Sequence, residues 1–392
     1  MVSGLMSQSA FDVETQYFQV AAPGETVVLR EGKLTGPVQL AYETYGTLNA
    51  AKDNAILLFH ALSGSHHAAG YNPKVEAAGN LWTEDMHLGW WNDYIGKGKA
   101  LDTDKYFIIC ANYLGGCYGS TSPMDKDPET GRPRGSRFPH IRTSDQCEVQ
   151  AKLLDHLGID VCRAVIGPSV GGMLALTFAG MYPERVRKVV PIASSWKTTV
   201  LNRLILFEQI LAIENDPHFH GGDYYHTNGP TYGLALARMI SHKTFVHLDA
   251  IERRARQEVK QAEDHFAWYV IRDSVQSYVM HQGKKFVHRF DANTYLRICE
   301  MWSCYHPVQE CGADSPLEML KRCADAGQEF LVFSIDSDFC FYPEEQDQMV
   351  RHLKEAGVKN MHLTVHSEKG HDSFLLEPEL FAPHLDHLLS RG

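Results

Sequence analysis

The sequence has no apolar run long enough to cross a membrane, and its first residues, MVSGLMSQSAFDVE, lack the basic and apolar segments of a secretory signal. Positive charge is in deficit, because 37 Lys and Arg face 48 Asp and Glu, for a formal net charge of −11. This balance argues against nucleic acid or an anionic membrane surface as the main partner. The nine cysteines include no C-x-x-C pair, so we expect reduced thiols, no zinc site and a cytoplasmic location.

Strand and helix patterns alternate along the 392 residues, of which 44% are hydrophobic, enough for a large core. Apolar runs typical of buried strands are followed by segments with helical periodicity. The strand patterns cover residues 55–62, 106–112, 164–166, 186–195, 329–336 and 361–367, and the helical ones 144–159, 172–181, 343–357 and about 373–390. This succession predicts an α/β fold with a mostly parallel, twisted sheet flanked by helices.

Helical patterns replace the strands from about residue 197 to residue 325. A sheet that is interrupted by helices and then resumes predicts one catalytic domain, residues 1–196 and 326–392, with a helical lid inserted at 197–325. Near the N-terminus, after a poorly ordered lead-in, residues 26–30 and 38–46 predict an antiparallel hairpin around the turn GKLTGP.

The only G-x-S-x-G of the sequence has Ser169 at its centre. A strand pattern precedes it and a helix pattern follows it, so the serine falls on a strand-to-helix turn. In a nucleophile elbow, the flanking glycines permit a sharp turn that places the serine Oγ at the positive end of the helix. We therefore interpret Ser169 as a nucleophile. The simpler interpretation is a glycine-rich turn with a buried serine.

A serine nucleophile needs a base, and the base needs a carboxylate to fix its tautomer. In this fold the partners follow in the order Ser, Asp, His, on loops after late strands. His371 stands between the last strand and the closing helix. Asp336 and Asp338 both follow the strand pattern at 329–336, and we favour Asp338 because Asp336 lies at the strand edge, where it can serve the turn alone.

Backbone N–H groups must stabilise the oxyanion of an acyl transfer. The elbow supplies Val170, and the loop after residues 55–62 offers Leu62. That loop, SGSHHAAG, is too rich in Gly, Ser and His for a core segment, and its simpler interpretation is a tight turn with two solvated histidines. His66 and His67 are adjacent and so point in different directions, which makes a poor metal pair, and we assign no metal.

Eight segments, in order, resemble the homoserine O-acyltransferases, an acetyl- or succinyl-CoA-dependent family of the α/β-hydrolase superfamily. They are FHALSGSHHAAG, GWWNDYIGKGKALDTDKYFIICANYLGGCYGSTSP, the elbow with Gly172, GGDYY, GLALARMI, RFDANTYL, SDFCFYPEEQ and GHDSFLLE. The resemblance covers nearly the whole chain. It implies an α/β-hydrolase fold, a ping-pong reaction of methionine biosynthesis, a homodimer built through the helical insertion, and a deep tunnel to the serine.

Residue by residue, the resemblance implies that Ser169, Asp338 and His371 form the triad and that Leu62 and Val170 form the oxyanion hole. The CoA thioester then acylates the serine, and the homoserine hydroxyl attacks the acyl-enzyme with the histidine as base. The implied acyl donor is acetyl-CoA or succinyl-CoA, acetyl being favoured only as the commoner one, and no permanently bound cofactor is implied.

The resemblance also assigns Arg238 to the carboxylate of the amino acid and Asp372 to its ammonium group. A zwitterion entering a dry tunnel needs one cation and one anion. Two residues depart from the family pattern: Pro168 replaces a glycine before the nucleophile, and Phe245 replaces a tyrosine that helps to bind the substrate. The acceptor pocket is therefore the part most open to change.

Three alternatives stay open. The acceptor can be serine or another hydroxylated metabolite, with the same chemistry. An esterase or thioesterase would use the same triad with water, although water needs no clamp made of Arg238 and Asp372. The third alternative is a catalytically inactive scaffold used for binding.

Overall fold

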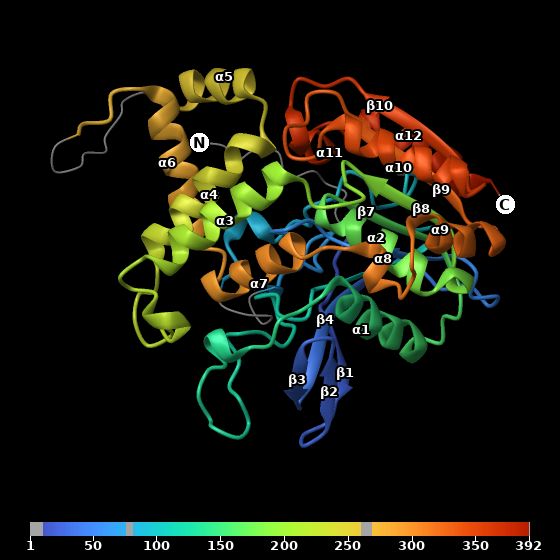
Figure 1. Cartoon of the computed structure of the whole chain (residues 1–392), viewed down its shortest axis with the longest axis horizontal. Coiled ribbons are helices and arrows are strands. Elements are labelled where there is room, and N and C mark those ends of the chain that lie inside the picture. Colours follow the sequence, from blue (N-terminus) through green and yellow to red (C-terminus); the bar gives the residue numbers. More distant parts are fainter. Residues whose placement is uncertain (1–10, 76–80, 260–268, 392) are drawn as a thin grey trace.

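An eight-stranded sheet forms the centre of the molecule, with helices on both of its faces (Figure 1). The computed structural model describes residues 11–75, 81–259 and 269–391. In spatial order the strands are β1 (Gln16–Ala21), β4 (Val38–Tyr45), β6 (Phe107–Ala111), β5 (Ala55–Leu58), β7 (Cys162–Pro168), β8 (Val186–Ile192), β9 (Glu329–Ile335) and β10 (Lys359–Val365). β4 pairs antiparallel with β1 and β6, and the other pairs are parallel. The predicted α/β class with a mostly parallel sheet is confirmed.

The central strands are apolar on both sides because helices cover both faces of the sheet. On one face pack α1 (Thr143–His156), α2 (Val170–Met181), α9 (Pro316–Asp325) and α10 (Pro343–Glu355). The other face is covered by α12 (Ala382–Ser390) and by apolar side chains between residues 91 and 101. The short helices are η2 (Glu84–Met86), η3 (Gly135–Arg137), η4 (Pro183–Arg185), η5 (His220–Gly222), η6 (Gly370–Asp372), α11 (Ser373–Leu376) and η7 (Pro378–Leu380).

The predicted N-terminal hairpin is wrong in its pairing. β2 (Thr26–Leu29) pairs with β3 (Gly32–Thr35), in a small two-stranded sheet of its own. The segment GKLT, taken as a turn, is the second strand because the chain already reverses tightly at residues 30 and 31. β4 belongs to the main sheet, where its apolar side chains are buried.

Helices fill the chain between β8 and β9. They are α3 (Val200–Glu214), α4 (Thr231–Phe245), α5 (Leu248–Glu258), α6 (Ser274–Val287), α7 (Ala292–Ser303) and α8 (Pro307–Glu310), followed by α9. The helices α3 to α7 pack on one another, whereas α8 and α9 pack on α2. The predicted boundaries of the insertion, 197 and 325, stay a prediction, and we propose that the lid proper ends after α7. Of the helices described, none is both long enough and apolar enough to span a bilayer.

Candidate active site

Ser169 stands on a sharp turn between β7 and α2, at the carboxyl edge of the sheet. Its backbone angles are φ 57° and ψ −127°, a conformation that costs a non-glycine residue about 1–3 kcal/mol. Close approach explains the flanking glycines: a Cβ on Gly167 would lie 2.0 Å from the carbonyl oxygen of Gly171. The serine is only 3% exposed. The local structure is therefore a strained, buried elbow that points one hydroxyl at the loops above the sheet.

Pro168, which departs from the family pattern, is the last residue of β7 and lies beside Ile192 of β8. Proline has no N–H to donate. The next amide, that of Ser169, donates to the carbonyl oxygen of Ile192 at 2.9 Å. Pro168 therefore ends β7, and the chain still makes its sharp turn at the next residue, Ser169.

The three predicted triad side chains lie together. His371 Nε2 is 2.9 Å from Ser169 Oγ, and His371 Nδ1 is 2.7 Å from Asp338 Oδ2. The other oxygen of Asp338 accepts the backbone N–H groups of Cys340 (2.7 Å) and Phe341 (2.9 Å). With Nδ1–H donated to the carboxylate, Nε2 is the nitrogen left to take the serine proton.

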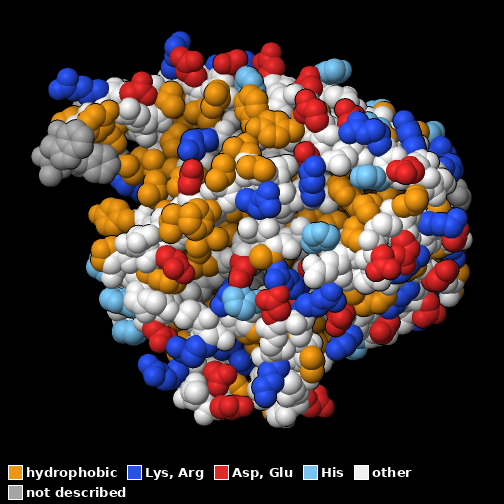
Figure 2. Space-filling model, viewed as in Figure 1, with side chains coloured by type: hydrophobic (Ala, Val, Ile, Leu, Met, Phe, Trp, Pro, Cys, Tyr) orange, Lys and Arg blue, Asp and Glu red, His pale blue; other side chains and the backbone are white. Residues whose placement is uncertain are grey.

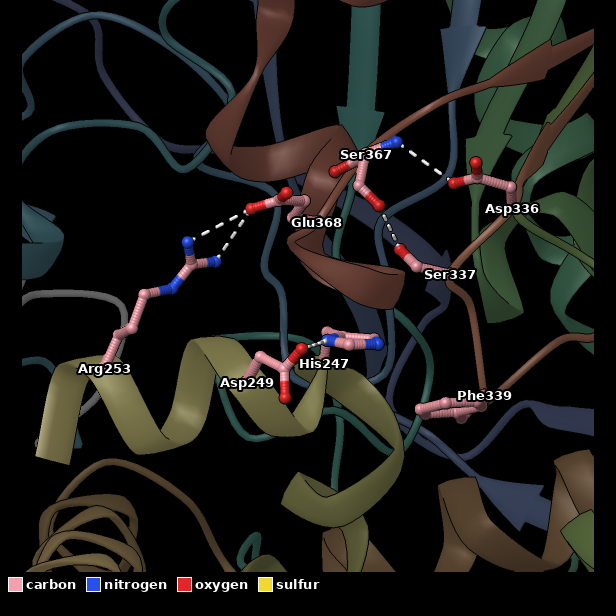
Figure 3. A pocket seen from close by; sticks show the side chains of 8 residues that line it. All are labelled: His247, Asp249, Arg253, Asp336, Ser337, Phe339, Ser367 and Glu368. Carbon is pink, nitrogen blue, oxygen red and sulfur yellow. Dashed lines mark hydrogen bonds and ion pairs between the residues drawn. The ribbon is translucent and has the colours of Figure 1, made fainter.

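Asp336, the rejected alternative for the acid, has other partners (Figure 3). Its carboxylate accepts the backbone N–H of Ser367 at 3.0 Å and lies 2.8 Å from His366 Nδ1. It lines a cavity of about 530 Å³ on whose rim Arg253 of α5 pairs with Glu368. This cavity is lined by neighbours of the triad residues but by no member of the triad.

The basicity of His371 is set by its surroundings. Burial by itself lowers the pKa of the imidazole, but the hydrogen bond and charge of Asp338, with the charge of Asp372, raise that pKa above its usual 6.5. The ring packs against Phe341, with centroids 5.3 Å apart. His371 therefore accepts a proton readily, and the imidazolium that forms is stabilised as an ion pair with the Asp338 carboxylate.

The loop after β5, which carries Leu62, passes directly over the first turn of α2. A Cβ on Gly171 would lie 2.4 Å from the carbonyl oxygen of Phe59 and 2.8 Å from that of His60. In the described part of the chain, neither the Leu62 nor the Val170 amide donates to a protein acceptor. Both residues are buried. Two free backbone donors beside a nucleophile are what an oxyanion hole requires.

Arg238 and Asp372 are half-buried opposite charges that lie close enough for each to shift the pKa of the other. Arg238 lies on α4, and its guanidinium stacks over the rings of Phe286 (4.9 Å) and Phe245 (5.4 Å). Asp372 follows His371 directly, and burial raises the pKa of its carboxyl. Within the described ranges, neither side chain forms a hydrogen bond or an ion pair with protein. Since unpaired charges are costly out of water, both are suited to charges brought by a ligand.

Phe245 contacts both His371 and Arg238. Its ring centroid is 5.8 Å from that of His371 and 5.4 Å from the guanidinium carbon of Arg238. A tyrosine here would place a hydroxyl among these groups, and phenylalanine places only ring atoms. Phe245, one of the two residues at which the sequence departs from the family pattern, therefore lies in the candidate active site.

The expectation that SGSHHAAG is too polar for a core segment is wrong, and so is the simpler interpretation of its two histidines as solvated. His66 and His67 are completely buried, and both face Glu43 of β4. Among the described residues, no group of three or more His, Cys, Asp or Glu could hold a metal ion. The histidines belong to a buried hydrogen-bond network.

Two features near the triad were missed in the sequence. Arg289, the first residue of RFDANTYL, lies over Phe286 (5.5 Å) and reaches Ser63 Oγ at 3.5 Å, beside the Leu62 loop. His60 stacks on Tyr113, with centroids 3.7 Å apart. The motif RFDANTYL contained Arg289, but nothing in the sequence indicated the stacked pair, whose members lie in two separate segments, after β5 and after β6.

Comparisons with known proteins agree with this architecture. Residues 54–378 match the family model of the alpha/beta hydrolase fold. The chain is 39% identical to a homoserine O-acetyltransferase of Desulfotalea psychrophila, over 93% of this chain and 91% of the relative. It is 40% identical to a homoserine O-succinyltransferase of Acidithiobacillus ferrooxidans, over 90% and 89%.

Two solved structures are similar over almost their whole length. A homoserine O-acetyltransferase from Bacillus anthracis is 25% identical, with a TM-score of 0.83 and coverage of 97% of this chain and 98% of that one. Esterase E22 is also 25% identical, with a TM-score of 0.83 and coverage of 96% and 100%. Overall shape alone therefore does not separate acyl transfer from ester hydrolysis.

Proposed function

The chain belongs to the homoserine O-acyltransferases, a family with the α/β-hydrolase fold, and we propose that it transfers an acyl group from acyl-CoA to the hydroxyl of L-homoserine. The observation that carries this proposal is a cation and an anion beside the triad, Arg238 and Asp372, which influence each other electrostatically but form no direct salt bridge within the described residues. A zwitterionic amino acid supplies one charge for each. The product, an O-acylhomoserine, suits a place in methionine biosynthesis.

In the first half-reaction, the Ser169 hydroxyl gives its proton to His371 Nε2 and attacks the thioester carbonyl. The tetrahedral oxyanion is held by the amides of Leu62 and Val170. As the C–S bond breaks, the imidazolium returns the proton to the CoA sulfur. The acyl group is then an ester on Ser169, and Asp338 has stabilised the imidazolium throughout.

In the second half-reaction, Arg238 holds the carboxylate of homoserine and Asp372 its ammonium. His371 takes the proton of the homoserine hydroxyl, whose oxygen attacks the acyl carbonyl. Collapse of the second tetrahedral state returns the proton to Ser169 and releases the O-acyl amino acid. The acceptor must be positioned for this attack, because water competes for the same acyl-enzyme.

Thiol release from acetyl-CoA or succinyl-CoA, measured with homoserine or serine as acceptor, tests the proposal. We expect homoserine to accelerate turnover with at least one donor. Equal rates with and without either amino acid would instead favour the esterase or thioesterase alternative, which the likeness to esterase E22 keeps open. A preference for serine would contradict homoserine as the acceptor.

We also propose that the protein is a homodimer that pairs through the insertion. The outward face of α3 carries an exposed apolar stripe at helical spacing, formed by Val200, Leu204, Phe207 and Leu211. Tyr232 and Leu236 extend it on the neighbouring α4. Figure 2 shows hydrophobic side chains gathered on the left of the view, where Figure 1 places the helices of the insertion. An exposed apolar patch of this kind is typical of an interface between proteins. If a second copy of the chain covers the patch, light scattering should show that the Phe207→Glu variant is a monomer.

A further inference from the structure

A buried carboxylate that the reaction does not use lies behind the Leu62 loop. Glu43 of β4 is 0% exposed. Its oxygens accept hydrogen bonds from His67 Nδ1 (2.8 Å), the Tyr45 hydroxyl (2.8 Å), Asn72 Nδ2 (2.9 Å) and Thr15 Oγ1 (3.2 Å). Burial raises the pKa of Glu43, but the bond from His67 and the imidazoles beside it outweigh burial and lower that pKa. The group is therefore a carboxylate, fully bonded, inside the protein.

His67 completes an ion pair with this carboxylate. Its Nδ1 faces Glu43 Oε2, and its Nε2 lies 2.9 Å from the backbone carbonyl oxygen of His87. Both partners can only accept, so both ring nitrogens must donate. The geometry thus makes His67 an imidazolium, paired with Glu43 away from solvent.

Glu43 and its neighbour Tyr45 hold the C-terminal part of the Leu62 loop. The Tyr45 hydroxyl, bonded to Glu43, lies 3.1 Å from the carbonyl oxygen of His66 and accepts the N–H of Ala68 at 2.7 Å. Since the one hydroxyl proton of Tyr45 goes to Glu43, the carboxylate and this hydroxyl hold two consecutive residues: His67 through its side chain and Ala68 through its N–H.

The other end of the loop is held separately. The Tyr113 hydroxyl donates to the backbone carbonyl of His60, and the two rings stack. Burial lowers the pKa of His60 to about 3, so this imidazole is neutral. The Leu62 amide therefore lies between the aromatic attachment at His60 and the ionic attachment at His67. Between these two, Arg289 contacts Ser63 Oγ at 3.5 Å and Trp90 Nε1 donates to the Ser65 carbonyl at 2.9 Å.

We infer that the Glu43–His67 ion pair is a positioning element of the oxyanion hole, which fixes the Leu62 amide over Ser169 from the C-terminal side of the loop. The inference rests on the proposed acyl-serine mechanism. A hydrogen bond to a developing oxyanion depends steeply on donor placement, and supporting groups must hold that donor to within a fraction of an ångström. Removing a whole oxyanion donor costs about 10²–10³ in kcat, so displacing one by loosening its support costs less.

A Glu43→Gln variant tests the inference, because glutamine keeps the shape and removes the charge. The readout is the pre-steady-state burst of p-nitrophenol from p-nitrophenyl acetate, which needs only the nucleophile, the base and the oxyanion hole. We expect the acylation rate constant to fall about 10- to 100-fold, with KM unchanged and with native circular dichroism. Glu310→Gln is the matched control, since Glu310 is also buried but bonds to Ser144 of α1.

An acylation rate within about twofold of native for Glu43→Gln would overturn the inference. An equal fall in Glu310→Gln would also overturn it, because the effect would then follow from lost stability. If Glu43→Gln does not fold, Tyr45→Phe is judged by the same criteria, since it removes only the hydroxyl that joins the carboxylate to the loop. The proposed mechanism fails separately, if Ser169→Ala retains the burst.

Discussion

Replacing Arg238 with glutamine removes the charge that we assign to the acceptor carboxylate. The guanidinium has aromatic faces at 4.9 and 5.4 Å and, among the described residues, forms no direct salt bridge, although the charge of Asp372 is close enough to raise its pKa. No protein ion pair is therefore lost with it, and the effect reports on the ligand. Arg289 lies close enough for its charge to lower the pKa of Arg238, after burial as the larger cause.

The expected magnitude follows from the bond that is lost. A hydrogen bond to a charged group contributes about 1.5–3 kcal/mol. At about 1.4 kcal/mol for each factor of ten, kcat/KM for homoserine falls about 10- to 150-fold. The acylation half-reaction involves no amino acid, so the burst with p-nitrophenyl acetate stays unchanged. The loss therefore appears only in the second half-reaction.

Thiol release at saturating acyl-CoA, with homoserine varied, measures this effect. Arg256→Gln is the control, because Arg256 is an exposed arginine on α5 that pairs with Glu252 of the same helix. An unchanged kcat/KM for homoserine would remove Arg238 from the acceptor site. An equal fall in the p-nitrophenyl acetate burst would show that the substitution damages the triad instead.

Three further predictions concern the triad and its neighbour. Asp338→Asn should lower kcat about 10³- to 10⁴-fold by leaving the histidine in the wrong tautomer, whereas Asp336→Asn should change it little; the reverse order in steady-state assays would exchange their roles. The acidic limb of kcat/KM should have an apparent pKa above 6.5, since His371 must be neutral to take a proton and its pKa is raised; a limb below 6.5 in a pH profile would count against the pairing. Phe245→Tyr should raise kcat/KM for homoserine about 2- to 10-fold by restoring one hydrogen bond, and a gain for serine alone would contradict the assigned acceptor.

The elbow and its partners could be predicted from the sequence because each follows from local pattern. Ser169 carries a short motif between a strand and a helix, and His371 and Asp338 follow late strands, where the fold gathers its loops. The choice of Asp338 over Asp336 depended on where the strand was expected to end. The hydrogen bonds now distinguish the two, because Asp338 bonds to His371 and Asp336 to the backbone of Ser367. Pattern alone could place these residues at the same edge of the sheet, but could give no distance between them.

The buried network around Glu43 could not be predicted in the same way. A loop with adjacent histidines has the composition of a solvated turn, and a glutamate in a strand has that of an exposed face. Each of these polar groups is buried only because the others satisfy it. The small β2–β3 sheet was missed for a related reason, since GKLT has the residues of a turn and becomes a strand only by pairing with its neighbour.

Trapping the acyl-enzyme tests the central claim most directly. The protein is mixed with acetyl-CoA or succinyl-CoA, quenched in acid, digested and examined by mass spectrometry, with and without a short chase of homoserine. We predict one acyl group on the peptide that contains Ser169, lost far faster in the chase with homoserine than in buffer. No acyl group on that peptide with either donor, or an acyl group whose loss homoserine does not accelerate, would contradict the account.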